Sequence, residues 1–409
     1  MRLLLFANQY FSEKGVNHDL RFSTEILKRY GDLDIYIIHL GEESIDNVYS
    51  IQGMTMLNKM LAIKKYIQEN KIDIVHIWGI GLMSYDHFVF YWGVILSGIK
   101  FVITPFNHVT KFSLNNKLFY EDPDVKTILR YEVGNKRGSN KLRNQILAVF
   151  SPIAKKVYLL TFGKLFIRES KSIIFFSEFE KSEFISYCNY PKQTFILPEP
   201  ILHIEKLISE KKNVSRTASF FNDERYSSCI NIVYWGRLDY KVKGLDRIVG
   251  ALISMRKKDP KKIIKIHLMG PDYNNGRIRI EKDIKEFSLE KYIIVHDEEA
   301  WRGTKKPLID SDLSILASRA DGFPRALRES IALQVPVIVS IETNFHDLIK
   351  KFNCGYAFNS QSELVDIFLK LNKKAINGLK GNCILASQFI SEKEVALNLQ
   401  RTYAIIENS

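Results

Sequence analysis

The stretch DLSILASRADGFPRALRESIALQVPVIVS, residues 312–340, decides the fold of this chain. Residues 313–317 form a short apolar run that predicts a buried strand, and residues 318–323 form a polar, glycine-containing loop. Pro324 suits the first position of a helix, because its missing N–H would be unpaired there anyway. Residues 335–339 then predict a second buried strand. This β-loop-α-β unit predicts a parallel sheet whose ligand-binding edge lies at the carboxyl ends of its strands.

The loop at 318–323 is a natural seat for an anion. The helix that follows presents unpaired backbone N–H groups, and Gly322 lets a ligand approach the main chain closely. Two carboxylates, Asp321 and Glu329, bracket this seat. Their spacing alone carries no information, since 46 acidic residues among 409 produce about five such pairs by chance. The loop and the helix around the pair carry the signal.

This run resembles the signature of the retaining glycosyltransferases of family 4. The resemblance implies an α/β protein of the GT-B fold, with two Rossmann-like, doubly wound domains facing across a cleft. It implies that Asp321 hydrogen-bonds the donor sugar and that Glu329 binds the ribose hydroxyls of the nucleotide. It also assigns the diphosphate to the loop and the helix start, at Gly322, Phe323 and Pro324.

The chain departs from the family pattern at two positions. The family usually has Glu where this chain has Asp321, which is one methylene shorter, so the contact with the donor sugar is expected to differ. The family also usually has glycine at the helix end that Gln334 occupies here. A left-handed residue other than glycine costs roughly 1 kcal/mol at such a position.

A second motif, GRLDYKVKGLD at residues 236–246, follows a predicted strand at 231–235. It resembles the Gly-Arg-Leu…Lys-Gly segment of the same family. A guanidinium and an ammonium that converge on a diphosphate would neutralise the leaving group. The resemblance therefore makes Arg237 and Lys243 catalytic, with Gly236 allowing the ligand to approach the backbone closely. Gly-Arg or Lys-Gly by itself would suggest only a surface turn. The list of donor contacts is completed by Gly270, in a loop that the family places near the nucleotide.

The N-terminal half alternates four strands with helices, which predicts a doubly wound sheet. Gly15, in the first loop, corresponds to the glycines that the family places near the donor diphosphate. His108 follows the fourth strand. Its position alone favours a histidine that caps a loop, whereas the resemblance implies a catalytic contact with the donor sugar. The predicted strands are 3–7, 34–40, 73–78 and 100–104.

The length of 409 residues suits two domains. We expect an acceptor-side Rossmann-like domain at 1–200, a linker or insertion at 201–228, a nucleotide-sugar-binding Rossmann-like domain at 229–385, and a C-terminal helix at 386–409 that crosses back to the first domain.

The net charge of +13 implies an anionic partner. Nucleotide-sugars, anionic lipid headgroups and nucleic acid would all fit, but no nucleic-acid motif is present, so nucleic acid is not expected. Residues 125–171 carry eleven basic side chains against two acidic ones. This basic tract is interpreted equally well as a solvated face and as a membrane-contacting surface.

Neither a signal peptide nor an apolar run long enough to span a bilayer is evident, and the four cysteines lack paired metal spacing. These features predict a cytoplasmic protein, with peripheral binding at the inner membrane face as an extension of the basic tract.

The predicted function is transfer of a hexose from a nucleotide-sugar to a glycan acceptor, lipid-linked in cell-surface polysaccharide synthesis. No metal cofactor is expected, since Arg237, Lys243 and the helix start would do its work. One alternative is a non-catalytic GT-B partner subunit or sugar-binding protein. Another is a metal-dependent GT-A transferase, which would use one of the Asp-x-Asp triplets at 32–34, 122–124 and 310–312.

Overall fold

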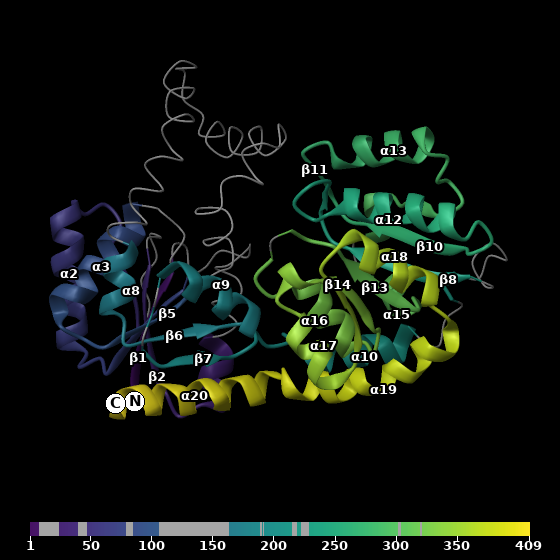
Figure 1. Cartoon of the computed structure of the whole chain (residues 1–409). Helices are drawn as coiled ribbons and strands as arrows, with labels where there is room; N and C mark the ends of the chain where they lie inside the picture. The colour runs from purple at the N-terminus through teal and green to yellow at the C-terminus, as the bar shows by residue number, and fades with distance from the viewer. Residues whose placement is uncertain are drawn as a thin grey trace, which may run out of the picture. The chain divides into compact units, whose positions relative to one another are not determined.

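The computed structural model of the 409-residue chain divides into two compact units (Figure 1). Unit 1 comprises Met1–Pro198 and Lys393–Ser409, and unit 2 comprises Glu199–Glu392. Gly15, His108 and most of the basic tract lie outside the described residues. The described residues are 1–7, 24–39, 47–78, 85–105, 163–188, 190, 192–214, 219–221, 229–301, 304–319 and 321–409.

Unit 1 is built on a seven-stranded parallel sheet in the order β3-β2-β1-β4-β5-β6-β7. The chain moves outward from β1 in one direction and then from β4 in the other, which is the Rossmann arrangement. The four strands predicted in this half are confirmed. The strands are β1 (Arg2–Ala7), β2 (Asp34–His39), β3 (Val48–Ser50), β4 (Ile74–Trp78), β5 (Phe101–Thr104), β6 (Ser172–Phe175) and β7 (Thr194–Ile196).

Helices cover the sheet of unit 1. On one side, Phe90 stacks on the β1 residue Phe6 with ring centroids 4.2 Å apart. The final helix of the chain contributes Tyr403, whose hydroxyl lies 2.7 Å from Nδ1 of the buried His76. The last residues of the chain therefore pack within unit 1. The helices are α2 (Met56–Glu69), α3 (Tyr85–Ser97), α8 (Lys164–Glu169), α9 (Glu178–Cys188) and α20 (Glu392–Asn408), besides helical residues 24–30.

Unit 2 is built on a six-stranded parallel sheet in the order β12-β10-β8-β13-β14-β15. The strand order again reverses at the centre, here between β8 and β13, and the predicted β-loop-α-β unit is confirmed. The strands β9 and β11, which follow β8 and β10 in the chain, form a separate two-stranded parallel sheet. The strands are β8 (Ile230–Trp235), β9 (Leu238–Asp239), β10 (Ile264–Met269), β11 (Asp272–Tyr273), β12 (Ile293–Val295), β13 (Leu313–Leu316), β14 (Val337–Ser340) and β15 (Gly355–Phe358).

The helices of unit 2 correct one prediction. The sequence also predicts a single helix at 301–309, and this prediction is wrong. Two short helices, α14 and α15, share the region, and Pro307 lies in the first turn of α15, a position that proline tolerates. The segment 201–228 contains a helix, α10. The helices are α10 (Ile204–Val214), α12 (Leu245–Lys258), α13 (Gly276–Glu286), α14 (Glu298–Trp301), α15 (Lys306–Ile309), α16 (Arg325–Ala332), α17 (His346–Phe352), α18 (Gln361–Lys370) and α19 (Lys373–Phe389), with the 3₁₀ turn η2 (Ile341–Thr343).

Across the described part of the chain, no helix combines the length and the apolar character that crossing a membrane would require.

Candidate functional site

The candidate site lies in unit 2, where the strand order reverses. The strands β8 and β13 are neighbours in the sheet, and the loops that leave their carboxyl ends carry both sequence motifs. In open α/β sheets, ligands bind at this kind of position, because loops on the two sides of the reversal diverge and leave a crevice.

Lys243 and Asp321, one from each loop, form an ion pair. Lys243 Nζ lies 2.5 Å from Asp321 Oδ2, and the two side chains are 17% and 16% exposed. Ser318 Oγ donates to the same carboxylate oxygen at 3.1 Å. The predicted cation and the predicted sugar-binding acid are thus brought together at the sheet edge, mostly shielded from water.

The loop between β13 and α16 is held through backbone carbonyl groups, which accept hydrogen bonds from a side chain outside the loop. Asn344 Nδ2 donates to the carbonyl oxygen of Gly322 at 2.7 Å and to that of Asp321 at 3.3 Å. The Phe323 side chain is buried, with its ring centroid 4.5 Å from that of Phe345. Phe323 can therefore offer a ligand its backbone but not its ring. These contacts hold the backbone of residues 321–323 in place beside the start of α16, where an anion can bind.

Helix α16 starts one residue later than predicted, because Pro324 occupies the N-cap with φ −59° and ψ 129° and Arg325 is the first helical residue. The first N–H groups of any helix have no partner within it, so this end of α16 suits a negative charge. At the other end, Gln334 adopts φ +60°, so the left-handed conformation expected there is confirmed.

Glu329, farther along α16, is paired with a lysine that the sequence did not reveal. Lys305 Nζ donates to Glu329 Oε2 at 2.7 Å, and the two side chains are 23% and 17% exposed. The same ammonium lies 5.6 Å from the centroid of the Trp235 ring at the end of β8. Lys305 is 24 positions away from Glu329 and belongs to no motif, so no sequence signal could have found it.

The glycines at 236 and 270 are in direct contact. Gly236 N donates to the Met269 carbonyl at 3.0 Å, and a Cβ at Gly270 would lie 1.8 Å from the Gly236 carbonyl oxygen, so only glycine fits at 270. The backbone thereby turns out of β8 and exposes Arg237, whose guanidinium carbon lies 4.4 Å from the centroid of the Tyr273 ring. This cation is positioned by the aromatic face and remains open to a ligand.

Tyr234 holds the backbone of Arg237 in place through a hydrogen bond. Its hydroxyl, fully buried, donates to the Arg237 carbonyl oxygen. Burial and the nearby carboxylates of Asp321 and Asp239 raise the pKa of Tyr234 well above its ordinary value. Tyr234 is therefore a neutral hydrogen-bond donor at physiological pH.

All predicted site residues that are described lie on the loops of unit 2 and on α16. They are Gly236, Arg237, Lys243, Gly270, Asp321, Gly322, Phe323, Pro324 and Glu329. Together with Lys305, their arrangement offers three cations, a helix start and two carboxylates, which is suited to a dianionic ligand that also carries hydroxyl groups. Among the described residues, no group of three or more His, Cys, Asp or Glu side chains could hold a metal ion.

Comparisons with known proteins bear on the family and the fold of this chain. Residues 215–377 match the family model described as glycosyl transferases group 1. A search of curated proteins finds no match.

Among solved structures, sucrose-phosphate synthase from Thermosynechococcus elongatus is 14% identical, with 99% of this chain and 98% of that chain covered and a TM-score of 0.62. HepE from Anabaena, solved in complex with UDP, is also 14% identical, with 99% and 100% covered and a TM-score of 0.62. WaaB, a lipopolysaccharide outer core galactosyltransferase in its apo form, is 12% identical, with 100% of each chain covered and a TM-score of 0.61. These likenesses confirm the GT-B fold, with its two Rossmann-like domains, and rule out the GT-A alternative.

Proposed function

We propose that this protein is a retaining glycosyltransferase of family 4 that transfers a hexose from a nucleotide-sugar to a glycan acceptor. The observation that carries the proposal is the pairing of Lys243 with Asp321 beside the start of α16. A nucleotide-sugar combines a diphosphate with hydroxyl-rich groups on both sides, and this site places cations and amides between two carboxylates.

The donor would lie along the sheet edge of unit 2. Glu329 would accept hydrogen bonds from the ribose hydroxyls, and Lys305, paired with it, would hold the carboxylate in its orientation. The diphosphate would meet Lys243, Arg237 and the N–H groups at the start of α16. Asp321 would accept a hydrogen bond from the sugar. The UDP bound to HepE supports a nucleotide of this class.

The reaction proposed is a front-face displacement. The bond between the anomeric carbon and the diphosphate oxygen breaks while the acceptor hydroxyl approaches from the same side, so the anomeric configuration is retained. A diphosphate oxygen takes the proton of the attacking hydroxyl. Lys243 and Arg237 stabilise the negative charge that grows on the departing diphosphate, and such stabilisation is usually the largest single contribution to catalysis.

The acceptor that we propose is a lipid-linked glycan of a cell-surface polysaccharide, reached at the cytoplasmic face of the inner membrane. The lipopolysaccharide galactosyltransferase among the structural neighbours supports this class of acceptor, and the net charge of +13 supports contact with anionic lipid. In the described part of the basic tract, α8 buries Phe166 and Ile167 while Lys164 and Arg168 are exposed. This pattern fits a cationic face over an apolar stripe.

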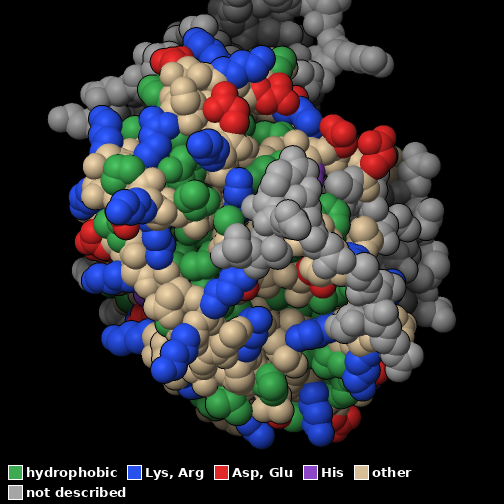
Figure 2. Space-filling model, turned by 90° about the vertical axis from the view of Figure 1, so that its right-hand side faces the viewer, with side chains coloured by type: hydrophobic (Ala, Val, Ile, Leu, Met, Phe, Trp, Pro, Cys, Tyr) green, Lys and Arg blue, Asp and Glu red, His purple; other side chains and the backbone are tan. Residues whose placement is uncertain are grey.

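Unit 2 has a cationic surface of its own, at the edge of the sheet where its strands begin. Figure 2 shows a face of the molecule on which Lys and Arg side chains dominate the left and lower parts. The ends of α12 and α18 meet at this edge, where Lys262 Nζ donates to the Leu371 carbonyl at 2.5 Å. The exposed members of this unit 2 surface are Lys257, Lys258, Lys261, Lys370, Lys373 and Lys374. It is the alternative place for an anionic partner.

The test is nucleotide release. UDP-, GDP- and dTDP-sugars are first screened by thermal shift, because a ligand that binds the native state raises its melting temperature. The donor that binds is then incubated with membrane-extracted acceptor, and release of nucleotide and the anomeric configuration of the product are followed by NMR. Stabilisation without any release would favour the second candidate, a sugar-binding or partner subunit, for which the shorter side chain of Asp321 is the motivating observation.

A further inference from the structure

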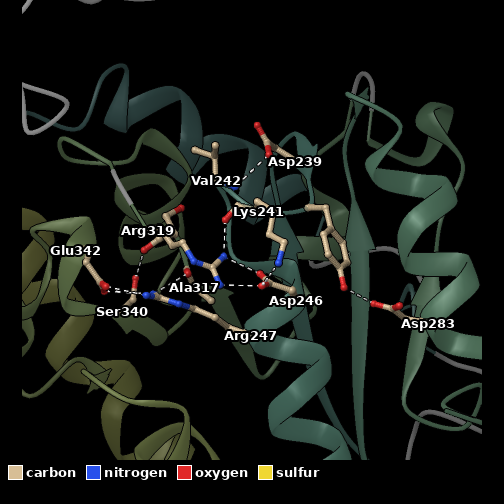
Figure 3. Close-up of polar contacts among 12 residues, drawn as sticks. Asp239, Lys241, Val242, Asp246, Arg247, Asp283, Ala317, Arg319, Ser340 and Glu342 are labelled. Carbon is tan, nitrogen blue, oxygen red and sulfur yellow. Dashed lines mark hydrogen bonds and ion pairs between the residues drawn. The ribbon is translucent and has the colours of Figure 1, made fainter. Parts of the chain in front are cut away.

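The loops that carry Lys243 and Asp321 are joined by a further set of contacts (Figure 3). Arg319, which precedes Asp321 by two positions, donates its backbone N–H to the Val242 carbonyl at 2.9 Å. Its guanidinium Nη1 also donates to the Lys241 carbonyl at 2.6 Å. The two residues before Lys243 are therefore tied to Arg319 by its backbone and its side chain.

The Arg319 guanidinium binds a carboxylate in the first turn of α12. Nη1 and Nη2 lie 2.7 Å from Oδ1 and 2.7 Å from Oδ2 of Asp246, a bidentate pair that fixes both side chains. Lys241 Nζ reaches the same carboxylate at 3.3 Å. Burial tends to raise the pKa of Asp246, but the hydrogen bonds and charge of Arg319 outweigh it and leave the pKa below its ordinary value. The pair is thus ionised at every physiological pH.

A second ion pair holds the same helix to the 3₁₀ turn η2, which follows β14. Arg247 Nη2 lies 2.8 Å from Glu342 Oε1, and the Glu342 carbonyl accepts the N–H of Asp321 at 3.2 Å. Between the two pairs, Gly244 packs against β13 so closely that a Cβ would lie 1.9 Å from the Ala317 carbonyl oxygen. The start of α12, the loop of Lys243 and the loop of Asp321 therefore form one connected unit.

We infer that Arg319 is a positioning residue, which acts with Asp246 as a latch that fixes Lys243 opposite Asp321. The inference rests on the proposed function and adds to it a residue that would touch no substrate. Both terminal nitrogens of the Arg319 guanidinium donate to protein acceptors, so its role is to hold the loop that presents the lysine. A cation that is already in place binds a diphosphate without first giving up conformational freedom.

The test is a double-mutant cycle between Arg319 and Lys243 in the full chain. UDP, GDP and dTDP are titrated calorimetrically into the wild type, and the tightest binder serves as the probe. We expect Arg319→Met to weaken that affinity about tenfold in the wild type and less than twofold in the Lys243→Ala background, since the latch acts through Lys243. Equal losses in the two backgrounds would overturn the inference, because a structural or direct electrostatic role would persist without the lysine.

Two further variants make the result specific. Asp246→Asn should weaken binding as Arg319→Met does, whereas an Arg319 that met the diphosphate itself would bind as well or better once released. Arg256→Met, at the far end of the same helix, is the matched control and should leave the affinity unchanged. Should Arg319→Met not fold, Arg319→Lys keeps the charge but loses the fork, and unchanged affinity in that variant would also overturn the latch. If no nucleotide binds the wild type, the proposed function fails and the inference falls with it.

Discussion

Lys243 Nζ lies 2.5 Å from Asp321 Oδ2 although 78 positions separate the two residues in the chain. The contact joins the residue proposed to meet the diphosphate to the residue proposed to meet the sugar. A donor that enters the site must therefore share or displace this ion pair. The ion pair contributes only a modest free energy, because water can reach the site. The charge of the ligand can therefore compete for the lysine.

The first prediction concerns charge at the leaving group. Arg237→Ala and Lys243→Ala should each lower kcat/KM at least ~100-fold, or about 2.7 kcal/mol, because each removes a contact that strengthens as the diphosphate departs. Steady-state kinetics with the best donor measure this, and circular dichroism checks that the variants are folded. Activity within threefold of the wild type in both variants would remove them from the mechanism.

The second prediction concerns Asp321. Asp321→Asn should abolish most turnover, since the amide cannot replace the carboxylate toward both Lys243 and a sugar hydroxyl. Asp321→Glu should retain nucleotide binding but change the preferred sugar, because one methylene displaces the carboxylate by roughly 1.5 Å. Kinetics across a panel of donors distinguish the two effects. Undiminished turnover in Asp321→Asn would instead support a non-catalytic protein.

Both parallel sheets could be predicted from the sequence because buried parallel strands are short apolar runs between turn residues. Residues 230–235 and 313–316 illustrate this, and each was found within about one residue. The left-handed residue at Gln334 was expected from the resemblance, because the family usually has glycine at this helix end.

The ion pairs of the site could not be predicted in the same way. Lys305 with Glu329 and Arg319 with Asp246 join residues 24 and 73 positions apart. Which side chains meet across such distances depends on the register of two adjacent strands and on the geometry of their loops. The chain contains 59 basic and 46 acidic residues, so composition leaves the pairing open. Only the folded sheet selects the partners.

The third prediction is that transfer needs no bound metal. Arg237, Lys243 and the start of α16 would neutralise the diphosphate, which is the work that a divalent cation does elsewhere. Initial rates should therefore be the same within twofold after dialysis against EDTA, with or without added Mg²⁺ or Mn²⁺. Complete loss of transfer in EDTA, restored by either ion, would contradict this assignment.

The fourth prediction concerns acid stability, through His76 in unit 1 and His267 in unit 2. Burial lowers the pKa of His76 to about 3, and burial together with His296 and Lys265 lowers that of His267 to about 3. An unfolded histidine titrates near 6.5. Below pH 6.5 the unfolded chain therefore binds protons that the folded chain refuses, so stability falls as pH falls, by up to about 1.4 kcal/mol per pH unit for each histidine.

Urea denaturation at pH 7.5, 6.5 and 5.5 measures this loss. The free energy of unfolding should change little between pH 7.5 and 6.5 and should fall toward pH 5.5. His76→Asn should reduce this dependence to the part that His267 contributes, whereas His203→Asn, at an exposed position with positive φ that asparagine tolerates, should leave it unchanged. A slope that is identical in His76→Asn and in the wild type would show that this buried histidine is not the cause.

The last prediction concerns the membrane. Each Lys or Arg that reaches an anionic surface contributes about 1 kcal/mol, so four engaged residues give roughly 4 kcal/mol, enough for reversible peripheral binding. The chain should therefore sediment with anionic vesicles and not with neutral ones, and high salt should weaken the binding because the screening length shrinks.

Two variants that each remove four positive charges locate the contact. Replacing Lys155, Lys156, Lys164 and Arg168 by Ser should abolish sedimentation, because these residues belong to the basic tract. Replacing Lys257, Lys258, Lys261 and Lys373 by Ser removes the same charge from the unit 2 surface and should leave most of the binding intact, which separates a located contact from the effect of net charge. Loss in the second variant alone would move the membrane contact to unit 2. Equal binding to neutral vesicles would instead favour a soluble acceptor, since an enzyme that acts on a lipid-linked glycan must reach the charged surface that carries it.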